Sequence, residues 1–131
     1  MIAVDASVTA LALLDEGRAG DRCRAALHAD SQWLVPEHWL VEVLSVIRGS
    51  LLGGKVGSGH AADAVAAAAA LEPVVIPTRL LATRIWDLRG NLTTYDAAYV
   101  AVAEQWRCTL VTSDARLTRA NGPRCPVNLV A

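Results

Sequence analysis

The sequence predicts an α/β fold in which a mainly parallel central sheet lies between two layers of helices. Short apolar segments alternate with helical patterns along the chain, and this alternation builds parallel sheets that are covered on both faces. The length of 131 residues fits one domain, so residues 1–131 are expected to fold as a single unit. Apolar residues make up 53% and charged residues 19%, which excludes a disordered chain and leaves apolar surface for an oligomer or partner.

The first part of the chain begins with a strand over residues 2–4, a short apolar run. Apolar residues at helical spacing then predict a helix over 8–14, and a second helix is expected over 22–28. Residues 33–35 form the next extended segment, which Pro36 is expected to end.

The middle part contains a long helix over residues 37–52, which Gly53 and Gly54 end. A second helix covers residues 59–71, where a run of alanines favours helix strongly. Two prolines then enclose a short strand over residues 74–76.

The last part alternates helix and strand. Helices are expected over residues 78–88 and 93–106, each with a threonine at its first position as a candidate cap. A strand over 109–112, a short helix over 115–120 and a final strand over 127–129 complete the pattern. We therefore expect the strands at 2–4, 74–76 and 109–112 to share one sheet.

Composition limits the classes of function. A formal net charge of −1 disfavours a strongly basic, charge-driven nucleic-acid binder. Cys23, Cys108 and Cys125 are odd in number and form no C-x-x-C pair, so they indicate buried thiols rather than a zinc site or disulfides. No secretory signal is visible, and the longest unbroken apolar stretch, residues 64–71, is too short to span a bilayer. We expect a cytoplasmic protein with no membrane contact.

Three acidic residues lie where ligands bind in open α/β sheets, beyond the carboxyl ends of the strands. Asp5 ends the first strand, Asp114 follows the strand over 109–112, and Asp96 lies in the first turn of its helix. Each also has an ordinary interpretation, because an acid at these positions caps the helix that follows. The two interpretations are compatible, and the sequence leaves both open.

Glu42 is harder to explain by local structure. The helix around it is apolar over most of its girth, which predicts a largely buried helix. A half-buried carboxylate needs a partner, but Lys55 is the only lysine, and Arg48 lies off the Glu42 face. A divalent cation such as Mg²⁺, which prefers oxygen ligands, is the natural partner. A solvated Glu42 on the outer face is the alternative.

Four segments together resemble a known family. They are residues 1–7, with Asp5 after the first strand; 35–48, with Glu42; 95–104, with the run Tyr-Asp-Ala-Ala-Tyr; and 110–117, with Asp114. In this order, and over the whole chain, they resemble the PIN-domain family and, within it, the VapC toxins of bacterial toxin–antitoxin pairs.

The resemblance implies a PIN-like three-layer α/β/α sandwich and an endoribonuclease that depends on Mg²⁺ or Mn²⁺. Asp5, Glu42, Asp96 and Asp114 would form the catalytic and metal-binding site, with Asp5 and Asp96 as direct ligands and the others binding directly or through water. Water activated by the metal would attack the RNA phosphodiester. Ser7 and Thr112 carry hydroxyls where the family often has one beside the site, although ordinary strand-end hydrogen bonding explains them equally well. A homodimer and an inhibitory cognate antitoxin are also implied.

Two alternatives remain open. A catalytically idle PIN domain could serve as an RNA-binding or protein-binding module. A phosphoacceptor receiver domain also combines a parallel sheet, clustered acids and Mg²⁺, but it needs a lysine at a late strand end, and Lys55 lies elsewhere. The three histidines share no motif spacing, so we expect them to have packing or surface roles. Candidate contacts to RNA phosphates, or else solvated helix faces, are Arg79, Arg84, Arg89, Arg116 and Arg119.

Overall fold

The computed structural model describes residues 1–131 and contains one sheet of five parallel strands. The strands are β1 (Ile2–Val4), β2 (Trp33–Pro36), β3 (Val74–Ile76), β4 (Thr109–Thr112) and β5 (Val127–Leu129). They lie in the order β3-β2-β1-β4-β5, which places β1 at the centre. The predicted α/β class and the shared sheet are confirmed, and Pro36 is the last residue of β2.

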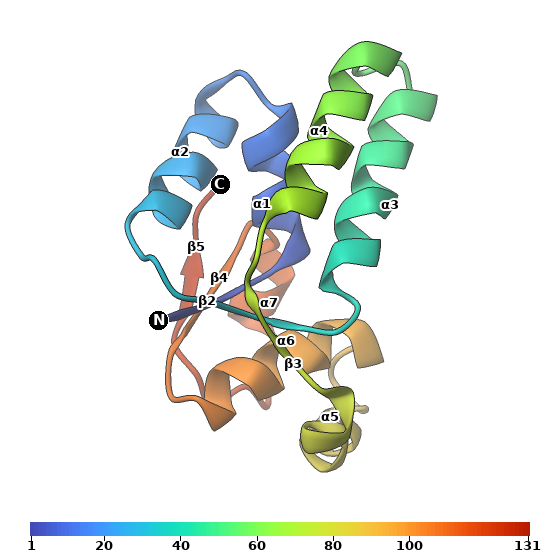
Figure 1. The fold of residues 1–131 in the computed structure, drawn as a ribbon. Coiled ribbons are helices and arrows are strands. Elements are labelled where there is room, and N and C mark those ends of the chain that lie inside the picture. Colours follow the sequence, from blue (N-terminus) through green and yellow to red (C-terminus); the bar gives the residue numbers. More distant parts are fainter.

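Helices cover both faces of the sheet (Figure 1). One layer consists of α1 (Ala6–Leu14), α2 (Arg18–His28), α3 (Trp39–Leu52) and α4 (Ser58–Ala70), which pack around α1. On the other face α6 (Thr94–Gln105) contacts β1, β2 and β4, and α5 (Ala82–Asp87) packs against α6. The short helix α7 (Ala115–Arg119) contacts β5. This arrangement is the three-layer sandwich that the sequence predicts.

The second helix begins earlier than the sequence predicts, at Arg18 instead of residue 22. The Asp15 carboxylate accepts hydrogen bonds from the backbone amides of Gly17 and Gly20, each at 3.0 Å. These amides lie at the start of the helix, where donors lack intrahelical partners. A side chain before the helix therefore supports the extra turn.

The predicted helix over residues 78–88 is divided in two, and Thr78 does not cap it. Thr78–Leu80 form a 3₁₀ turn without a side-chain cap, and α5 begins at Ala82. The Thr78 amide donates instead to Glu37 Oε1 at 2.7 Å. This bond ties the start of the segment to the loop after β2.

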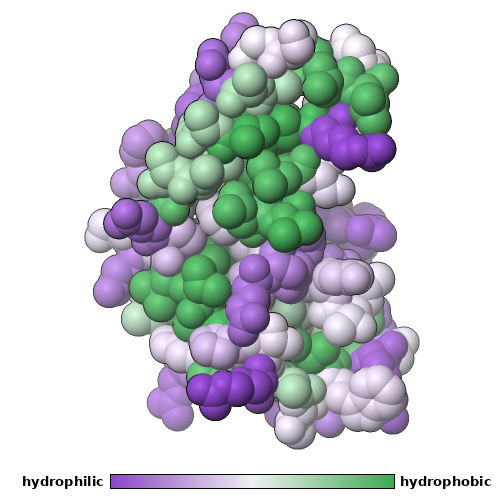
Figure 2. All heavy atoms as spheres, turned by 45° about the vertical axis from the view of Figure 1, so that its right-hand side comes forward, coloured by the Kyte–Doolittle hydropathy of each residue, from purple (hydrophilic) through white to green (hydrophobic).

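Helix α3 is not largely buried, so that prediction is wrong. Only Trp39, Val43 and Ile47 are buried, whereas Val41 is 69% and Leu52 67% exposed. Helices α1 and α4 cover one side of α3, whereas four of its apolar residues stay exposed: Val41, Val46, Leu51 and Leu52. Figure 2 shows hydrophobic residues gathered on the upper part of this side of the molecule, where α3 and α4 lie. This surface is apolar beyond the needs of the monomer's own core.

The core lies on both faces of the sheet. In α6 every residue over 97–103 is buried, and four of these seven are alanines, which let the helix lie close to the strands. No helix has the length and apolar character that crossing a membrane requires.

Candidate active site

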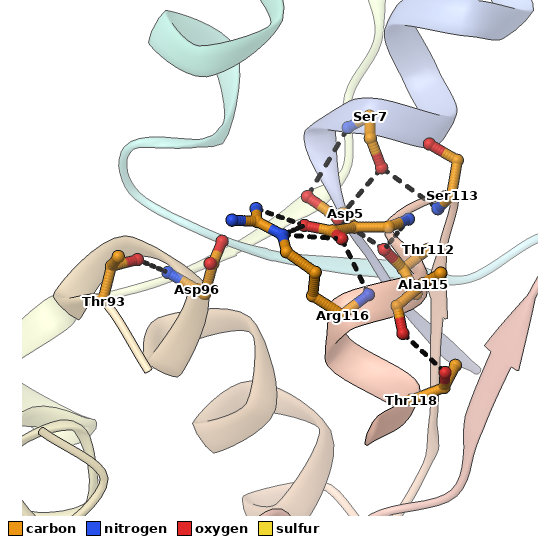
Figure 3. Close-up of polar contacts among 10 residues, drawn as sticks. Asp5, Ser7, Thr93, Asp96, Thr112, Ser113, Ala115, Arg116 and Thr118 are labelled. Atoms are coloured by element: carbon orange, nitrogen blue, oxygen red, sulfur yellow. Dashed lines mark hydrogen bonds and ion pairs between the residues drawn. The ribbon is translucent and has the colours of Figure 1, made fainter. Parts of the chain in front are cut away.

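Asp5 lies at the point of the sheet where a ligand site is expected. It directly follows β1, the central strand. The strands β2 and β3 lie on one side of β1, and the later strands β4 and β5 lie on the other, so the chain reverses its direction across the sheet at this place. Ligands bind at such topological switch points. The Asp5 carboxylate accepts hydrogen bonds from Ser7 Oγ at 2.9 Å and from Thr112 Oγ1 at 2.6 Å, as Figure 3 shows. It is also the N-cap of α1. The capping role and a position in the candidate site are therefore both present.

Two hydroxyls connect Asp5 to the turn that contains the next acid. Ser7 Oγ accepts from the Ser113 amide at 3.1 Å, and Thr112 Oγ1 accepts from the Asp114 amide at 3.0 Å (Figure 3). Each hydroxyl donates to Asp5 at the same time. Ser7 and Thr112 thus fix the Asp5 carboxylate relative to the end of β4.

The Asp5 carboxylate is buried, with 6% of the residue exposed. Burial raises its pKa, and this effect outweighs the hydrogen bonds from Thr112 and Ser7, which act in the opposite direction. The negative charge of Glu42 raises the pKa further. The charged form of Asp5 is therefore costly in the absence of a cation.

Asp96 lies in the first turn of α6, and Thr93 caps that helix as predicted: Thr93 Oγ1 accepts from the Asp96 amide at 3.1 Å. Burial is the largest influence on the Asp96 carboxylate and raises its pKa. The hydrogen bond with Thr93 and the charge of Arg116 lower it, whereas the charges of Asp114 and Glu42 raise it. Asp96 therefore lies within electrostatic range of two further acids of the candidate set.

Asp114 caps α7 and forms an ion pair with Arg116, a pairing that was not predicted from the sequence. Its carboxylate accepts from the Arg116 amide at 2.9 Å and from the Arg116 guanidinium at 2.6 to 3.1 Å (Figure 3). The hydrogen bonds from Arg116 lower the Asp114 pKa. The Arg116 side chain is 76% exposed, so the pair lies at the mouth of the site.

Glu42 has a partner within the protein, His38, which was not predicted from the sequence. His38 Nε2 lies 2.7 Å from Glu42 Oε1. The His38 ring lies edge-on to the rings of Tyr95 and Tyr99, with centroids 5.4 and 5.2 Å away. His38 thus packs against two tyrosines, which agrees with the expected packing role, and it also lies beside Glu42. The sequence feature that could have indicated this pair is the spacing of four residues between His38 and Glu42 at the start of a helix.

The four acids lie at the same end of the sheet. The charge of Glu42 acts on both Asp5 and Asp96, and that of Asp114 acts on Asp96. As the side chains stand, no group of three or more His, Cys, Asp or Glu residues is close enough to hold a metal ion. The roles of the individual acids as metal ligands remain predictions.

A hollow of about 320 Å³ opens beside Asp96, and Arg116 and Arg119 contribute to its wall. A larger hollow of about 670 Å³, which includes Cys108 and Cys125, contains none of the four acids. It lies where β4 and β5 begin, at the opposite end of the sheet, so size alone does not identify the candidate site.

In buffer that contains a chelator, Asp96→Asn is expected to gain stability over the parent as the pH rises from about 4 to 7. The folded protein raises the Asp96 pKa above its ordinary value of 3.8, so it binds this proton more tightly than the unfolded chain. Below 3.8 both states are protonated, and the parent loses this stabilisation as the pH rises through the folded-state pKa. Urea denaturation at several pH values measures the difference, and a difference independent of pH would contradict it.

Comparison with known proteins identifies the family. A family model of the PIN domain matches residues 2–123. Ribonuclease VapC9 of Mycobacterium tuberculosis is 36% identical over 130 residues, which cover 99% of this chain and 98% of the relative. Ribonuclease VapC12 of the same organism is 30% identical over 131 residues, with full coverage of both chains.

Solved structures share the fold. The crystal structure of Mycobacterium tuberculosis VapC20, a toxin that cleaves the sarcin–ricin loop, gives a TM-score of 0.65 at 20% identity and covers 91% of this chain and 94% of its own. VapBC2 from Rickettsia felis, bound to a DNA fragment from their promoter, gives 0.63 at 13% identity and covers 98% of each chain. With its sheet order, its acids at the switch point and these relatives, the chain belongs to the PIN-domain family and, within it, to the VapC ribonucleases.

Proposed function

We propose that this protein is a VapC-type toxin that hydrolyses RNA with the help of Mg²⁺ or Mn²⁺. One observation carries the proposal: in a chain of the VapC family, Asp5 lies buried at the switch point of the sheet with Glu42, Asp96 and Asp114 at the same end. The catalytically idle alternative is less favoured, because all four acids are present and the relatives are named ribonucleases. Metal-dependent cleavage of an RNA pool is the experiment that tests it.

The residues of the site fit a hard divalent cation. The donors are carboxylate oxygens, which Mg²⁺ and Mn²⁺ prefer. Glu42 Oε1 is buried 2.7 Å from His38 Nε2, and burial raises the pKa of Asp5 and Asp96. Like charges about 4 Å apart repel by roughly 4 kcal/mol at an effective dielectric constant of about 20, so a cation at this place would stabilise the cluster.

Each side chain then has a defined task. Asp5 and Asp96 would hold the ion directly, while Glu42 and Asp114 would bind it directly or through water. When bound, such an ion supplies a polarised phosphodiester oxygen and a water of lowered pKa. Ser7 and Thr112 keep the Asp5 carboxylate in place. Arg116 holds Asp114 and presents exposed positive charge where an RNA phosphate would approach.

Mg²⁺ or Mn²⁺ at millimolar concentration is expected to raise the melting temperature of the purified protein. A ligand that binds only the folded state stabilises it, by about 2.7 kcal/mol at a hundred times its dissociation constant. Scanning calorimetry with EDTA, with Mg²⁺ and with Mn²⁺ measures the effect. A melting temperature that does not respond to either metal would argue against a site at these acids.

The protein is expected to act with protein partners. Exposed apolar residues of α3, among them Val41 and Leu52, support a homodimer and a cognate antitoxin that covers the site. An arginine from the antitoxin would form charge-assisted hydrogen bonds with the carboxylates and compete with the cation.

Light scattering at micromolar concentration is expected to give about twice the chain mass of 13.9 kDa. Apolar surface that exceeds the needs of the monomer is the physical reason. A persistent monomer that also forms no stable complex with the product of the adjacent upstream reading frame would defeat the partner proposal. It would leave the nuclease proposal standing.

A further inference from the structure

The chain has three buried side-chain polar atoms that make no hydrogen bond, and all three lie at the candidate active site. They are His38 Nε2, Glu42 Oε1 and the hydroxyl of Tyr99. The His38 and Glu42 atoms are 2.7 Å apart, and the Tyr99 ring lies edge-on to the His38 ring. The His38 and Glu42 atoms face one another at ion-pair distance, which leaves the Tyr99 hydroxyl as the buried polar group of the three without a partner. Buried polar groups are normally hydrogen-bonded, so this hydroxyl calls for an explanation.

The Tyr99 hydroxyl lies within electrostatic range of the acids, although the residue belongs to the buried core. Tyr99 lies on α6 one turn after Asp96 and is fully buried. Burial is the main cause that raises its pKa, and the charges of Glu42, Asp5 and Asp96 add to it, with Glu42 contributing most among the three. The Ala6 amide lies near the hydroxyl and lowers its pKa, but an amide can only donate, so the hydroxyl proton is left without an acceptor. Tyr99 therefore stays protonated, and its hydroxyl is available to donate a hydrogen bond to a nearby carboxylate.

We infer that Tyr99 is a positioning residue that donates a hydrogen bond from its hydroxyl to the Glu42 carboxylate, opposite His38, when the site is loaded. Glu42 would then be fixed between the imidazole of His38, just before α3, and a phenol on α6. This contact would orient the carboxylate towards Asp5 and Asp96. The inference rests on the proposed metal-dependent function, because it assigns the residue that orients one of the proposed ligands.

A packing role alone does not account for the hydroxyl. A phenylalanine would fill nearly the same space without burying a polar group that lacks a partner. Tyr95 provides a matched control on the same helix, since its ring contacts His38 in the same edge-on manner but the residue is 64% exposed. Phenylalanine at each position keeps the ring and removes one hydroxyl.

The test compares the parent, Tyr99→Phe, Tyr95→Phe, Glu42→Gln and the double variant Tyr99→Phe/Glu42→Gln. Calorimetric titration with Mn²⁺ is expected to show binding about tenfold weaker in Tyr99→Phe and unchanged in Tyr95→Phe. Cleavage by Tyr99→Phe should show kcat about tenfold lower with KM within about twofold of the parent. In the Glu42→Gln background, Tyr99→Phe should cause no further loss of Mn²⁺ affinity, because the two residues act as one unit.

Stability without metal separates positioning from packing. In EDTA, Tyr99→Phe should melt no lower than the parent, because the change removes an unsatisfied buried hydroxyl. A lower melting temperature, Mn²⁺ affinity equal to that of the parent, or an equal loss in the Glu42→Gln background would each overturn the inference. If the parent itself binds no Mn²⁺, the proposed function fails and the inference fails with it; if the parent binds Mn²⁺ and only the Tyr99 effect is missing, the proposed function stands.

Discussion

Replacing Asp96 with asparagine is expected to lower RNA cleavage at least about a hundredfold while leaving the protein folded. Asparagine keeps the shape of the side chain and removes the charge that a divalent cation would need. The backbone amide of residue 96 keeps its hydrogen bond to Thr93, so the start of α6 is preserved. Initial rates on an RNA pool with Mg²⁺ or Mn²⁺ measure the effect.

Asp63→Asn is the charge-matched control for this experiment. Asp63 lies on α4 and is exposed, so the same chemical change there removes a charge outside the candidate site. It should cleave RNA at the rate of the parent. An Asp96→Asn protein that cleaves as fast as Asp63→Asn would show that Asp96 does not belong to the catalytic machinery.

Replacing Arg84 with methionine is expected to lower the stability of the fold by about 2–3 kcal/mol, since the change leaves a partly buried carboxylate unpaired. Arg84 donates to Glu104 at 2.6 and 3.2 Å and to the Gly122 carbonyl at 2.8 Å. It therefore ties α5 to α6 and to the segment before β5. Burial alone would raise the pKa of Glu104, but the hydrogen bonds from Arg84 and from the Arg124 amide outweigh burial and lower it.

Thermal unfolding should show the effect as a melting temperature roughly 6–10 °C lower. Arg48→Met, at an exposed position on α3, is the control and should change stability by no more than about 0.5 kcal/mol. Adding Glu104→Gln to Arg84→Met should recover part of the loss, because it removes the unpaired charge. A single Arg84→Met variant as stable as the control would contradict a structural role for this ion pair.

The order of elements could be predicted from the sequence because local patterns determine it. Short apolar runs formed β1, β3, β4 and β5 within the expected bounds. Helix starts were less predictable where a side chain from outside the helix bonds to the amides at its start. Asp15 extends α2 by bonding to two amides, and Glu37 binds the Thr78 amide from 41 residues away. Neither hydrogen bond is associated with a periodic pattern in the sequence, so neither could be predicted from it.

The burial of α3 was predicted incorrectly for a related reason. An apolar helix is buried only if enough neighbours exist, and in a chain of this size α1 and α4 cover one side alone. Its sequence therefore contains more apolar residues than the fold buries. The pattern of apolar residues cannot separate those that are buried from those that are not.

Within the candidate site, the positions of Asp5 and Asp114 were predictable because strand ends meet at one edge of a parallel sheet. The position of Asp96 was predictable because it lies at the start of the helix that leads into β4. The side chains that pair with these acids could not be predicted. His38 was separated from Glu42 by one helical turn and carried no motif, and Arg116 was one of several arginines with no feature to distinguish it. Side-chain pairing depends on tertiary geometry that spacing in the sequence does not encode.

Cleavage of an RNA pool by the purified protein, with and without divalent metal, tests whether this chain is a metal-dependent ribonuclease. We expect cleavage with Mg²⁺ or Mn²⁺, loss of cleavage in EDTA, and recovery when the metal is restored in excess. The proposed attack by water, rather than by a ribose hydroxyl, would leave products without a 2′,3′-cyclic phosphate. Cleavage that continues undiminished in EDTA, products with cyclic ends, or no cleavage in the presence of either metal would contradict the proposed function.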